Sequence, residues 1–393
     1  MNVSKIANCS GCGVCSIICP TQAIEIKENK YGNLVAFVND KCIECGKCVK
    51  VCPMYNLTSK KDIKDGGIKA LSAIDTQVNM ESSSGGVSTL IATYGLKNGY
   101  KIVGVKMDMS DLRAKFTVIN KIEELEDFRK SKYLQAYTLP AVQKLIEECN
   151  QNLEAKFIVF GMPCQINGLY SLVNAMQIKN EIIYIDFFCH GVPSYRTWDK
   201  YIDEVKKKND INDINSILFR DKSDGWHSFL MNIVGNNKYQ KFAPNDLFYQ
   251  AFFDNILLNK SCYDCRYRMG NTCADLRLGD FWGQKFKSNN KGVNACIIMN
   301  KRGDDILKNI SLLCNEYKDI EINDCLMYQS IKPYEWTKNN DCAREHLQNN
   351  DNLKIIIKGY RKKLGIKYLI KQNLKRILYK LPQKMRNAIK EKI

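Results

Sequence analysis

The first 58 residues contain eight cysteines in two matching blocks that are offset by 33 residues. Each block has the pattern C-x2-C-x2-C-x3-C-P. A cubane 4Fe-4S cluster needs four converging thiolates, and short gaps let one tight loop supply three of them. In two-cluster ferredoxins the fourth cysteine of each run ligates the other cluster. The spacing therefore predicts cluster I on Cys9, Cys12, Cys15 and Cys52, and cluster II on Cys42, Cys45, Cys48 and Cys19.

Structural zinc is the alternative for these cysteines, because paired C-x2-C units also bind zinc. Two complete four-cysteine runs that each end in proline favour iron. Gly11, Gly13 and Gly46 suit a backbone that passes close to an inorganic core. We expect residues 1–58 to form an α+β ferredoxin module with two 4Fe-4S clusters. Cluster ligation supplies much of its folding free energy, because so short a segment has little core of its own.

The whole chain has 18 cysteines in 393 residues, a number that bears on its compartment. The sequence MNVSKIANCSGC has no apolar signal-peptide core before its first cysteine, so export is not expected. No run of 18 apolar residues occurs, so a membrane-spanning helix is not expected. We therefore expect a cytoplasmic protein whose cysteines serve metal or redox chemistry, because disulfides are rare in a reducing compartment.

The chain beyond residue 58 divides into three further regions. A polar stretch that begins at Thr58 predicts a linker over 59–80. Over 81–340, apolar runs such as KFIVFGM and EIIYIDFFCHG alternate with helical segments such as PAVQKLIEECN. This alternation predicts a larger α/β domain with a mixed sheet. A basic helical tail is expected over 341–393.

Five cysteines of the central region form a third constellation. Cys164 and Cys189 each follow an apolar, strand-like run, and an open α/β fold places its ligands at strand ends. Cys262-x2-Cys265 adds a pair with metal-ligand spacing, and Cys273 follows it. We expect a third cluster here, with buried free cysteines as the alternative. The other cysteines have no partner at ligand spacing and are interpreted as packing residues: Cys149, Cys296, Cys314, Cys325 and Cys342.

A turn of small residues, SSSGGV over 82–87, precedes the apolar helical run STLIATYGL. Small residues that open a helix expose backbone N–H groups, which attract phosphate together with the helix dipole. A flexible turn with a helix cap would have the same sequence, and the motif alone favours that simpler interpretation.

Several motifs then occur in one order: SSSGGV, SKYLQAY, GMPCQ, FFCHGVPS and CYDC…ADLRLGDFWG. With them the chain resembles, over about residues 1–340, the family of beta subunits of coenzyme F-420 (deazaflavin) hydrogenases and dehydrogenases, with a fused two-cluster ferredoxin. The resemblance implies an enzyme that holds FAD and a further 4Fe-4S cluster and passes electrons between the clusters and a two-electron acceptor. It implies flavin-phosphate contacts at Ser84, Gly85, Gly86 and Val87, flavin neighbours at Lys132 and Tyr133, and a third cluster on Cys164, Cys189, Cys262 and Cys265.

Other residues of the central region keep two interpretations each. Cys273 would replace Cys189 as a ligand or be inert. His190 is the candidate catalytic residue, because a proton donor beside a reduced flavin is useful, whereas a loop histidine with satisfied hydrogen bonds is the alternative for it and for His227. Three basic residues would bind an anionic substrate or flavin phosphate, or would be surface charge: Arg220, Lys222 and Arg266.

The basic charge is concentrated in the tail. The formal net charge is +17, and residues 353–393 contribute 14 Lys or Arg against one acid, Glu391. Apolar residues in the tail share one helical face: Ile366, Ile370, Leu374, Ile377 and Leu381. This pattern predicts an interfacial helix on an anionic membrane surface, or a helix that packs its apolar stripe on the body of the protein. No nucleic-acid partner is expected, because no recognisable nucleic-acid motif accompanies the basic charge.

The leading function is an oxidoreductase that depends on flavin and 4Fe-4S clusters, with a redox protein, the deazaflavin or another small molecule as its partner. The alternative is a non-catalytic electron carrier of the polyferredoxin type, whose partner would hold the active site. A third hypothesis is a regulatory cluster protein that senses oxygen or iron. The central region is far larger than a carrier requires, which favours the enzyme.

Overall fold

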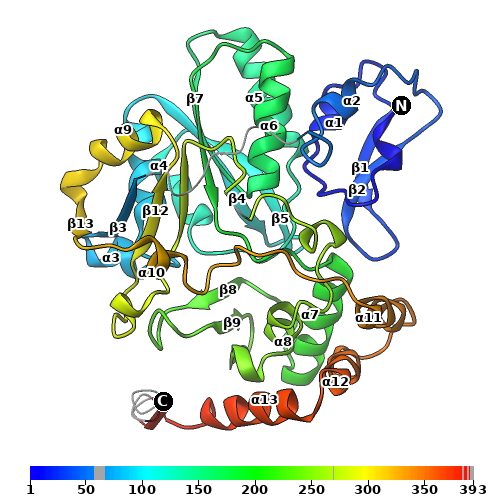
Figure 1. The fold of residues 1–393 in the computed structure, drawn as a ribbon, viewed down its shortest axis with the longest axis vertical. Coiled ribbons are helices and arrows are strands. Elements are labelled where there is room, and N and C mark those ends of the chain that lie inside the picture. Colours follow the sequence, from blue (N-terminus) through cyan, green and yellow to red (C-terminus); the bar gives the residue numbers. More distant parts are fainter. Residues whose placement is uncertain (57–66, 269, 383–384, 387–388, 390–393) are drawn as a thin grey trace.

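The computed structural model describes residues 1–56, 67–268, 270–382, 385–386 and 389 (Figure 1). The ferredoxin module comes first, with a two-stranded antiparallel sheet of β1 (Ile24–Glu28) and β2 (Leu34–Val38). Its short helices are α1 (Val14–Ile17) and α2 (Lys47–Lys50), preceded by the 3-10 turn η1 (Val3–Lys5). Each short helix follows a glycine in the left-handed region, Gly13 or Gly46, so the chain reverses just before it.

An eight-stranded mixed sheet forms the centre of the larger domain. Its strands in spatial order are β13 (Cys314–Tyr317), β3 (Ile68–Ala73), β12 (Asn294–Ile298), β11 (Leu276–Asp280), β7 (Ile182–Phe187), β6 (Lys156–Gly161), β4 (Tyr100–Asp108) and β5 (Arg113–Ile119). The four strands β4, β6, β7 and β11 run parallel to one another, and the remaining pairings are antiparallel. The α/β domain with a mixed sheet that the sequence predicted is confirmed.

Helices cover both faces of this sheet, because strand side chains alternate between the faces. On one face Ile102, Ile158 and Ile183 pack against α4 (Val87–Lys97) and α9 (Lys301–Asn309). On the other face Val103 and Phe157 pack against α5 (Leu139–Gln151) and α6 (Pro163–Ala175). Shorter elements around the sheet are α3 (Thr76–Met80), η3 (Ile122–Phe128), η6 (Gln284–Phe286), η7 (Ser311–Leu313) and α10 (Ile322–Leu326).

A second layer lies below the large sheet in Figure 1. It contains a three-stranded sheet of β8 (Ser216–Asp221), β9 (Leu230–Val234) and β10 (Lys238–Phe242). Two helices, α7 (Tyr195–Asn209) and α8 (Leu247–Phe253), belong to the same layer. The 3-10 turns η4 (Ala243–Asn245) and η5 (Lys260–Cys262) flank α8. The chain ends in α11 (Lys338–Gln348), α12 (Leu353–Lys363) and α13 (Ile366–Leu378).

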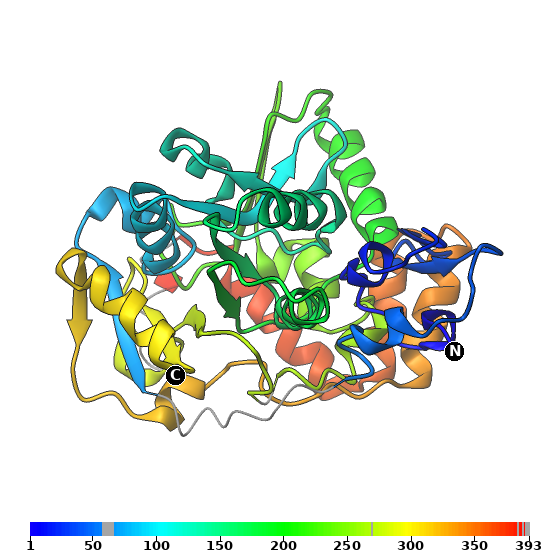
Figure 2. The same cartoon turned by 90° about the horizontal axis from the view of Figure 1, so that it is seen from above.

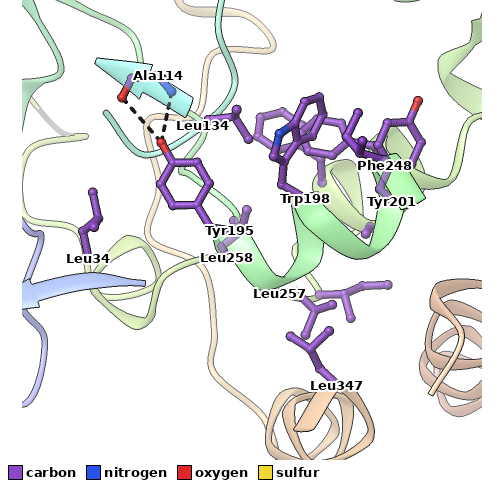
Figure 3. Close-up of a cluster of buried hydrophobic side chains, with 14 of the residues drawn as sticks. Leu34, Ala114, Leu134, Tyr195, Trp198, Tyr201, Phe248, Leu257, Leu258 and Leu347 are labelled. Carbon is purple, nitrogen blue, oxygen red and sulfur yellow. Dashed lines mark hydrogen bonds between the residues drawn. The ribbon is translucent and has the colours of Figure 1, made fainter. Parts of the chain in front are cut away.

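The ferredoxin module shares a core with the larger domain. Leu34 of β2 and Tyr195 of α7 belong to one buried cluster, part of which Figure 3 shows. Gln135 donates to the carbonyl of Leu34 at 2.9 Å and accepts from its N–H at 2.8 Å. Thr138 donates to the carbonyl of Cys12 at 2.8 Å. These buried hydrogen bonds fix the first cysteine run against the larger domain.

The expected linker over 59–80 contains two regular elements, β3 and α3. β3 lies inside the large sheet, where it pairs with β12 and β13. It buries Ala70 and Leu71. The polar sequence just before them predicted a linker instead of this strand. Residues 57–66 of that stretch lie outside the described residues. We propose that the larger domain begins at residue 68.

The C-terminal helices differ in what they bury. α12 places Leu353, Ile356 and Ile357 in the core shared with α7 and α8. α11 contacts the ferredoxin module, where Arg344 lies over the ring of Tyr31 at 4.7 Å. Figure 2 shows α11 and the ferredoxin module at the same end of the molecule. α13 has no buried residue, and its apolar residues are described further below. No helix in the described ranges is long and apolar enough to cross a membrane.

Candidate redox site

The cysteines predicted to hold cluster II surround one small cavity. Its walls include all four: Cys19, Cys42, Cys45 and Cys48. The side-chain amide of Asn2 donates to the Cys42 sulfur at 3.5 Å, and the N–H of Ala23 donates to the Cys19 sulfur at 3.3 Å. Hydrogen bonds to sulfur are among the factors that tune an iron–sulfur cluster. Cys45 is exposed, so this cavity opens close to the molecular surface.

The cysteines predicted to hold cluster I form a second group. The pKa of Cys12 is raised to about 12, chiefly by burial and then by the charges of Cys52 and Cys9. Burial and the charges of neighbouring thiols also raise the pKa of Cys15. Thiolates this close repel one another, and such a donor set suits the cationic iron that would neutralise it. In the described part of the chain no three His, Cys, Asp or Glu side chains close on one ion position.

Four cysteines of the larger domain come together at the carboxyl ends of β6 and β7. These strands are parallel neighbours, so the loops that follow them leave the sheet at the same edge. Cys164 lies in the first turn of α6 and Cys189 just after β7, while Cys262 and Cys265 approach from η5 and the turn after it. The pKa of Cys164 is raised by burial and then by the charges of Cys189, Cys265, Cys12 and Cys262. We call these four the third cysteine group.

The third cysteine group borders the cluster I cysteines. The charge of Cys12 acts on the Cys164 thiol, and a methyl group added at Gly168 of α6 would lie 3.1 Å from the Cys12 sulfur. Tyr267 is buried beside both groups, since its pKa is raised by burial and then by Cys164 and Cys12. Its hydroxyl donates to the carbonyl of Pro53. Centres bound at the two groups would therefore be direct neighbours.

Arg268 joins the loops that carry the third cysteine group. Its guanidinium donates to the carbonyls of Cys189 at 2.8 Å, His190 at 2.7 Å, Cys262 at 2.9 Å and Ser330 at 3.2 Å. Its charge also lowers the pKa of Cys189, against the larger raising effect of burial. Sequence reasoning selected the exposed Arg266 and missed the buried Arg268, because the four acceptors come from segments far apart in the chain.

A cavity of about 910 Å³ lies against the third cysteine group. This volume is within the range of sites that hold large cofactors and substrates. Its walls include Cys164, Cys189 and Cys262 together with predicted flavin and catalytic residues, namely Ser84, Gly86, Lys132, Tyr133 and His190. Three basic wall residues that sequence reasoning missed are Arg129, Lys130 and Lys287. The cysteines and the candidate cofactor residues therefore share one cavity.

The small-residue turn at 82–87 forms part of the cavity wall and leads into α4. Gly86 has a φ of 88°, where other residues are strained, and it directly precedes the helix. Lys222 holds the turn from behind, because its ammonium donates to the carbonyl of Ser84 at 2.6 Å and to that of Asn79 at 2.8 Å. The buried Lys222 therefore supports the turn and is not surface charge.

Two of the four residues implied as phosphate contacts do not line the cavity. Gly85 packs against the backbone of Leu71 and Asn294, where an added Cβ would lie only 2.6 and 2.8 Å from their atoms. Val87 is fully buried in the core between the sheet and α4. Of the four residues from Ser84 to Val87, only Ser84 and Gly86 line the cavity.

Lys132 and Tyr133 line the cavity from the segment between η3 and α5. Burial lowers the pKa of Lys132 to about 7. Its ammonium donates to the carbonyls of Asp127 and Arg129 at 2.8 and 2.7 Å. A lysine with this pKa can hold or release a proton at Nζ near neutral pH. The Tyr133 ring packs 5.1 Å from that of Phe252 and so gives the wall an aromatic surface.

His190 lies beside the third cysteine group with both ring nitrogens engaged. Nε2 donates to the carbonyl of Phe252 at 3.0 Å, so Nδ1 is the acceptor and receives the Tyr334 hydroxyl at 2.9 Å. Burial lowers the pKa of His190 to about 4, so the ring is neutral at pH 7. These contacts favour a loop histidine with satisfied hydrogen bonds over a proton donor.

We expect His190→Gln to keep about one third or more of wild-type turnover, because a neutral ring whose N–H is bound to the Phe252 carbonyl does not act as a general acid at pH 7. Steady-state assays and visible spectra of both proteins test this. A fall of about 100-fold with unchanged cofactor spectra would instead establish the general-acid role.

Arg220 lies behind the cavity wall and does not line it. It donates to Asp280 at 2.7 Å and lies 5.0 Å from the ring of Trp282, and both partners face the cavity. His227 also lines the cavity, and its Nε2 donates to the carbonyl of Phe286 at 3.1 Å. Arg220 therefore supports the wall and is buried, which excludes the surface-charge interpretation.

Two family matches cover the three cysteine groups, while the turn at 82–87 and the segment with Lys132 and Tyr133 lie outside both. Residues 154–321 match the C-terminal part of the coenzyme F420 hydrogenase/dehydrogenase beta subunit, and residues 8–56 match the 4Fe-4S dicluster domain. The first match contains the third cysteine group, and the second contains both cysteine blocks.

Similar proteins come from methanogenic archaea. The chain is 32% identical over 166 residues to a coenzyme F420-dependent sulfite reductase of Methanocaldococcus jannaschii, which covers 42% of this chain and 25% of that protein. It is 22% identical over 226 residues to one of the subunits of the F(420)H(2) dehydrogenase of Methanosarcina mazei. That match covers 54% of this chain and 61% of the subunit. The chain thus spans less than two thirds of either relative.

A solved structure, the F420-reducing NiFe hydrogenase complex of Methanosarcina barkeri, contains a chain with 16% identity and a TM-score of 0.46, over 76% of this chain and 93% of that one.

The two family matches and the cysteine geometry agree on the two parts of the molecule. The chain therefore combines a segment that matches the 4Fe-4S dicluster domain with a segment that matches the C-terminal part of the coenzyme F420 hydrogenase/dehydrogenase beta subunit.

Proposed function

We propose that this chain is an iron–sulfur flavoprotein oxidoreductase. It passes electrons between its ferredoxin-type clusters and FAD, and so reduces or oxidises a two-electron substrate, either the deazaflavin coenzyme or another small molecule. Bound FAD would supply the conversion between single electrons and electron pairs. A redox protein would exchange electrons with the ferredoxin module.

One observation carries the proposal: Cys164, Cys189 and Cys262 line the same cavity as the turn at 82–87. A phosphate-bearing cofactor held by that turn would share the cavity with the cysteines. Lys132 adds a half-buried amine whose pKa is lowered to about 7, and Tyr133 adds an aromatic surface. The residues present therefore suit FAD beside a third cluster.

The order of the cysteine groups supports a single electron path. The cluster II cavity lies near the surface at Cys45, and its residue Cys48 acts electrostatically on Cys15 of cluster I. Cys12 of cluster I acts in turn on Cys164. Electrons would therefore enter or leave at cluster II and exchange with the cavity through the third cysteine group. The helix α6 lies close to Cys12, since a Cβ added at Gly168 would lie 3.1 Å from the Cys12 sulfur.

Anaerobic purification with quantitation of iron, acid-labile sulfide and extracted flavin tests the proposal. We expect about twelve iron atoms and one flavin per chain, because each of three cubanes holds four irons. About eight iron atoms without flavin would support the electron-carrier alternative instead. Zinc in place of iron would contradict both.

A further inference from the structure

The helix α13 presents an apolar stripe to solvent. Its members are exposed over more than half of their surface: Ile366 by 73%, Ile370 by 54%, Leu374 by 62% and Ile377 by 59%. They recur at intervals of three and four residues, so they lie on one side of the helix. A protein surface in water rarely keeps four large aliphatic side chains in one continuous row. The stripe therefore needs a partner that covers it.

The opposite side of α13 fixes the direction in which the stripe points. The hydroxyl of Tyr368 donates to Asp254 of the segment after α8. The carbonyl of Arg376 accepts from the side-chain amide of Asn245 at 3.2 Å. Just after the helix, the ring of Tyr379 packs on a β10 residue at 5.4 Å. These contacts use the inner side, so the apolar stripe cannot turn inward without breaking them.

The charges around the stripe specify the chemistry of the partner. From residue 352 to residue 390 the sequence contains no Asp or Glu. Exposed lysines occur along α12, α13 and the turn that follows: Lys354, Lys358, Lys362, Lys363, Lys367, Lys371, Lys375 and Lys380. Lys367 and Lys371 follow Ile366 and Ile370 by one residue, about 100° round the helix. They therefore lie at the border of the stripe.

We propose that α13 docks this protein on an anionic lipid bilayer, with the stripe of Ile366, Ile370, Leu374 and Ile377 inserted at the interface and the bordering lysines against the head groups. An apolar stripe with lysines at its border is the arrangement of interfacial helices. Anionic head groups attract such lysines, and acyl chains cover the aliphatic side chains. A nucleic acid would use the lysines and leave the stripe in water.

Docking in this way would also orient the redox centres. Figure 1 shows α13 along one outer edge of the molecule and the ferredoxin module toward the opposite end. The ferredoxin module, which carries the cluster II cavity and the exposed Cys45, would therefore lie away from the bilayer. The docking itself does not rest on the redox chemistry, because it involves none of the cysteine groups.

Flotation of the full-length holoprotein with vesicles tests the proposal. We expect binding to mixed phosphatidylcholine–phosphatidylglycerol vesicles, little binding to phosphatidylcholine alone, and weakening as NaCl shortens the screening length. Ile370→Gln with Leu374→Gln should lower the bound fraction about tenfold or more, because the stripe loses its centre. Lys367→Gln with Lys371→Gln should lower it to a similar extent and flatten the salt dependence.

Matched controls keep this experiment specific. Leu153→Gln with Leu312→Gln removes two side chains that are exposed by 76% and 92%, and Lys207→Gln with Lys238→Gln removes two exposed lysines elsewhere. Both controls should bind as wild type does. The proposal is overturned if the α13 variants bind unchanged, or if neutral vesicles bind equally well. It is also overturned if the wild-type protein does not bind vesicles and light scattering shows that it is a dimer, while the Ile370→Gln, Leu374→Gln variant is a monomer.

Discussion

Replacing Cys164 with alanine is expected to remove the third cluster and to disconnect the N-terminal clusters from the cavity. Cys164 is the thiol on which the other three cysteines of its group and Cys12 all act, so it lies at the junction. Iron should fall from about twelve to about eight atoms per chain, with both N-terminal clusters retained. Substitution of residues that support metal ligands lowers metal affinity or activity by about 10–100-fold. Loss of a ligand itself should therefore lower turnover by about 100-fold or more.

Stopped-flow reduction separates this outcome from general damage. With reductant supplied through the ferredoxin module, the Cys164→Ala variant should reduce its N-terminal clusters at the wild-type rate and its flavin far more slowly. Cys149→Ala is the matched control for a buried cysteine, because Cys149 packs in the core between α5 and the sheet. It should keep the full iron content. Equal rates of flavin reduction in wild type and Cys164→Ala would remove the third cluster from the path.

The same measurements decide between Cys189 and Cys273. The charge of Cys189 acts directly on both Cys164 and Cys262. Cys164, Cys189, Cys262 and Cys265 already supply the four thiolates that one cubane needs. We therefore expect Cys189→Ala to lose the iron of one cubane and Cys273→Ala to keep it. The reverse result would assign the fourth ligand to Cys273.

The ferredoxin module could be predicted in detail because its information is local. Three of the predicted ligands of each cluster come from one run, and their regular spacing is visible in the sequence. The fourth predicted ligand belongs to the other run, and its assignment rests on a rule about cluster pairs and not on spacing. The cavity that Cys19 shares with Cys42, Cys45 and Cys48 has the same crossed arrangement.

The larger site could be predicted only in outline. Strand-end positions indicated Cys164 and Cys189, because the apolar runs before them were visible. Three features were not visible: the support of Ser84 by Lys222, the Arg268 contacts, and the burial of Val87. Each depends on segments that lie far apart in the chain or on the direction of a turn. Such pairings follow from sheet order, which one sequence does not reveal.

The tail shows a different limit. Periodicity placed Ile366, Ile370, Leu374 and Ile377 on one face, but it could not tell whether that face met the protein or the solvent. The contacts of Tyr368 and Arg376 decide this, because they occupy the inner side of α13. In α12 the same kind of stripe, with Leu353 at its start, turns inward. Both helices are rich in lysine and large aliphatic residues, so only tertiary contacts separate them.

Replacing Arg268 is expected to damage the third cluster through its loops and through its charge. Arg268→Gln leaves the carbonyls of Cys189, Cys262 and their neighbours without their shared donor, and each such bond to a charged group is worth about 1.5–3 kcal/mol. It also removes a positive charge beside the cluster thiolates, so the reduction potential of the third cluster should fall. Arg268→Lys keeps the charge but lacks the planar fork that reaches four carbonyls.

The two variants therefore separate position from charge. In a redox titration followed by electron paramagnetic resonance, Arg268→Lys should keep the potential close to wild type and lose iron on standing. Arg268→Gln should show both a lower potential and faster iron loss. Arg266→Gln is the matched control, since Arg266 precedes Arg268 by two residues and is exposed. A cluster whose potential and iron content are the same in Arg268→Gln as in Arg266→Gln would show that the guanidinium neither positions these loops nor tunes the cluster they surround.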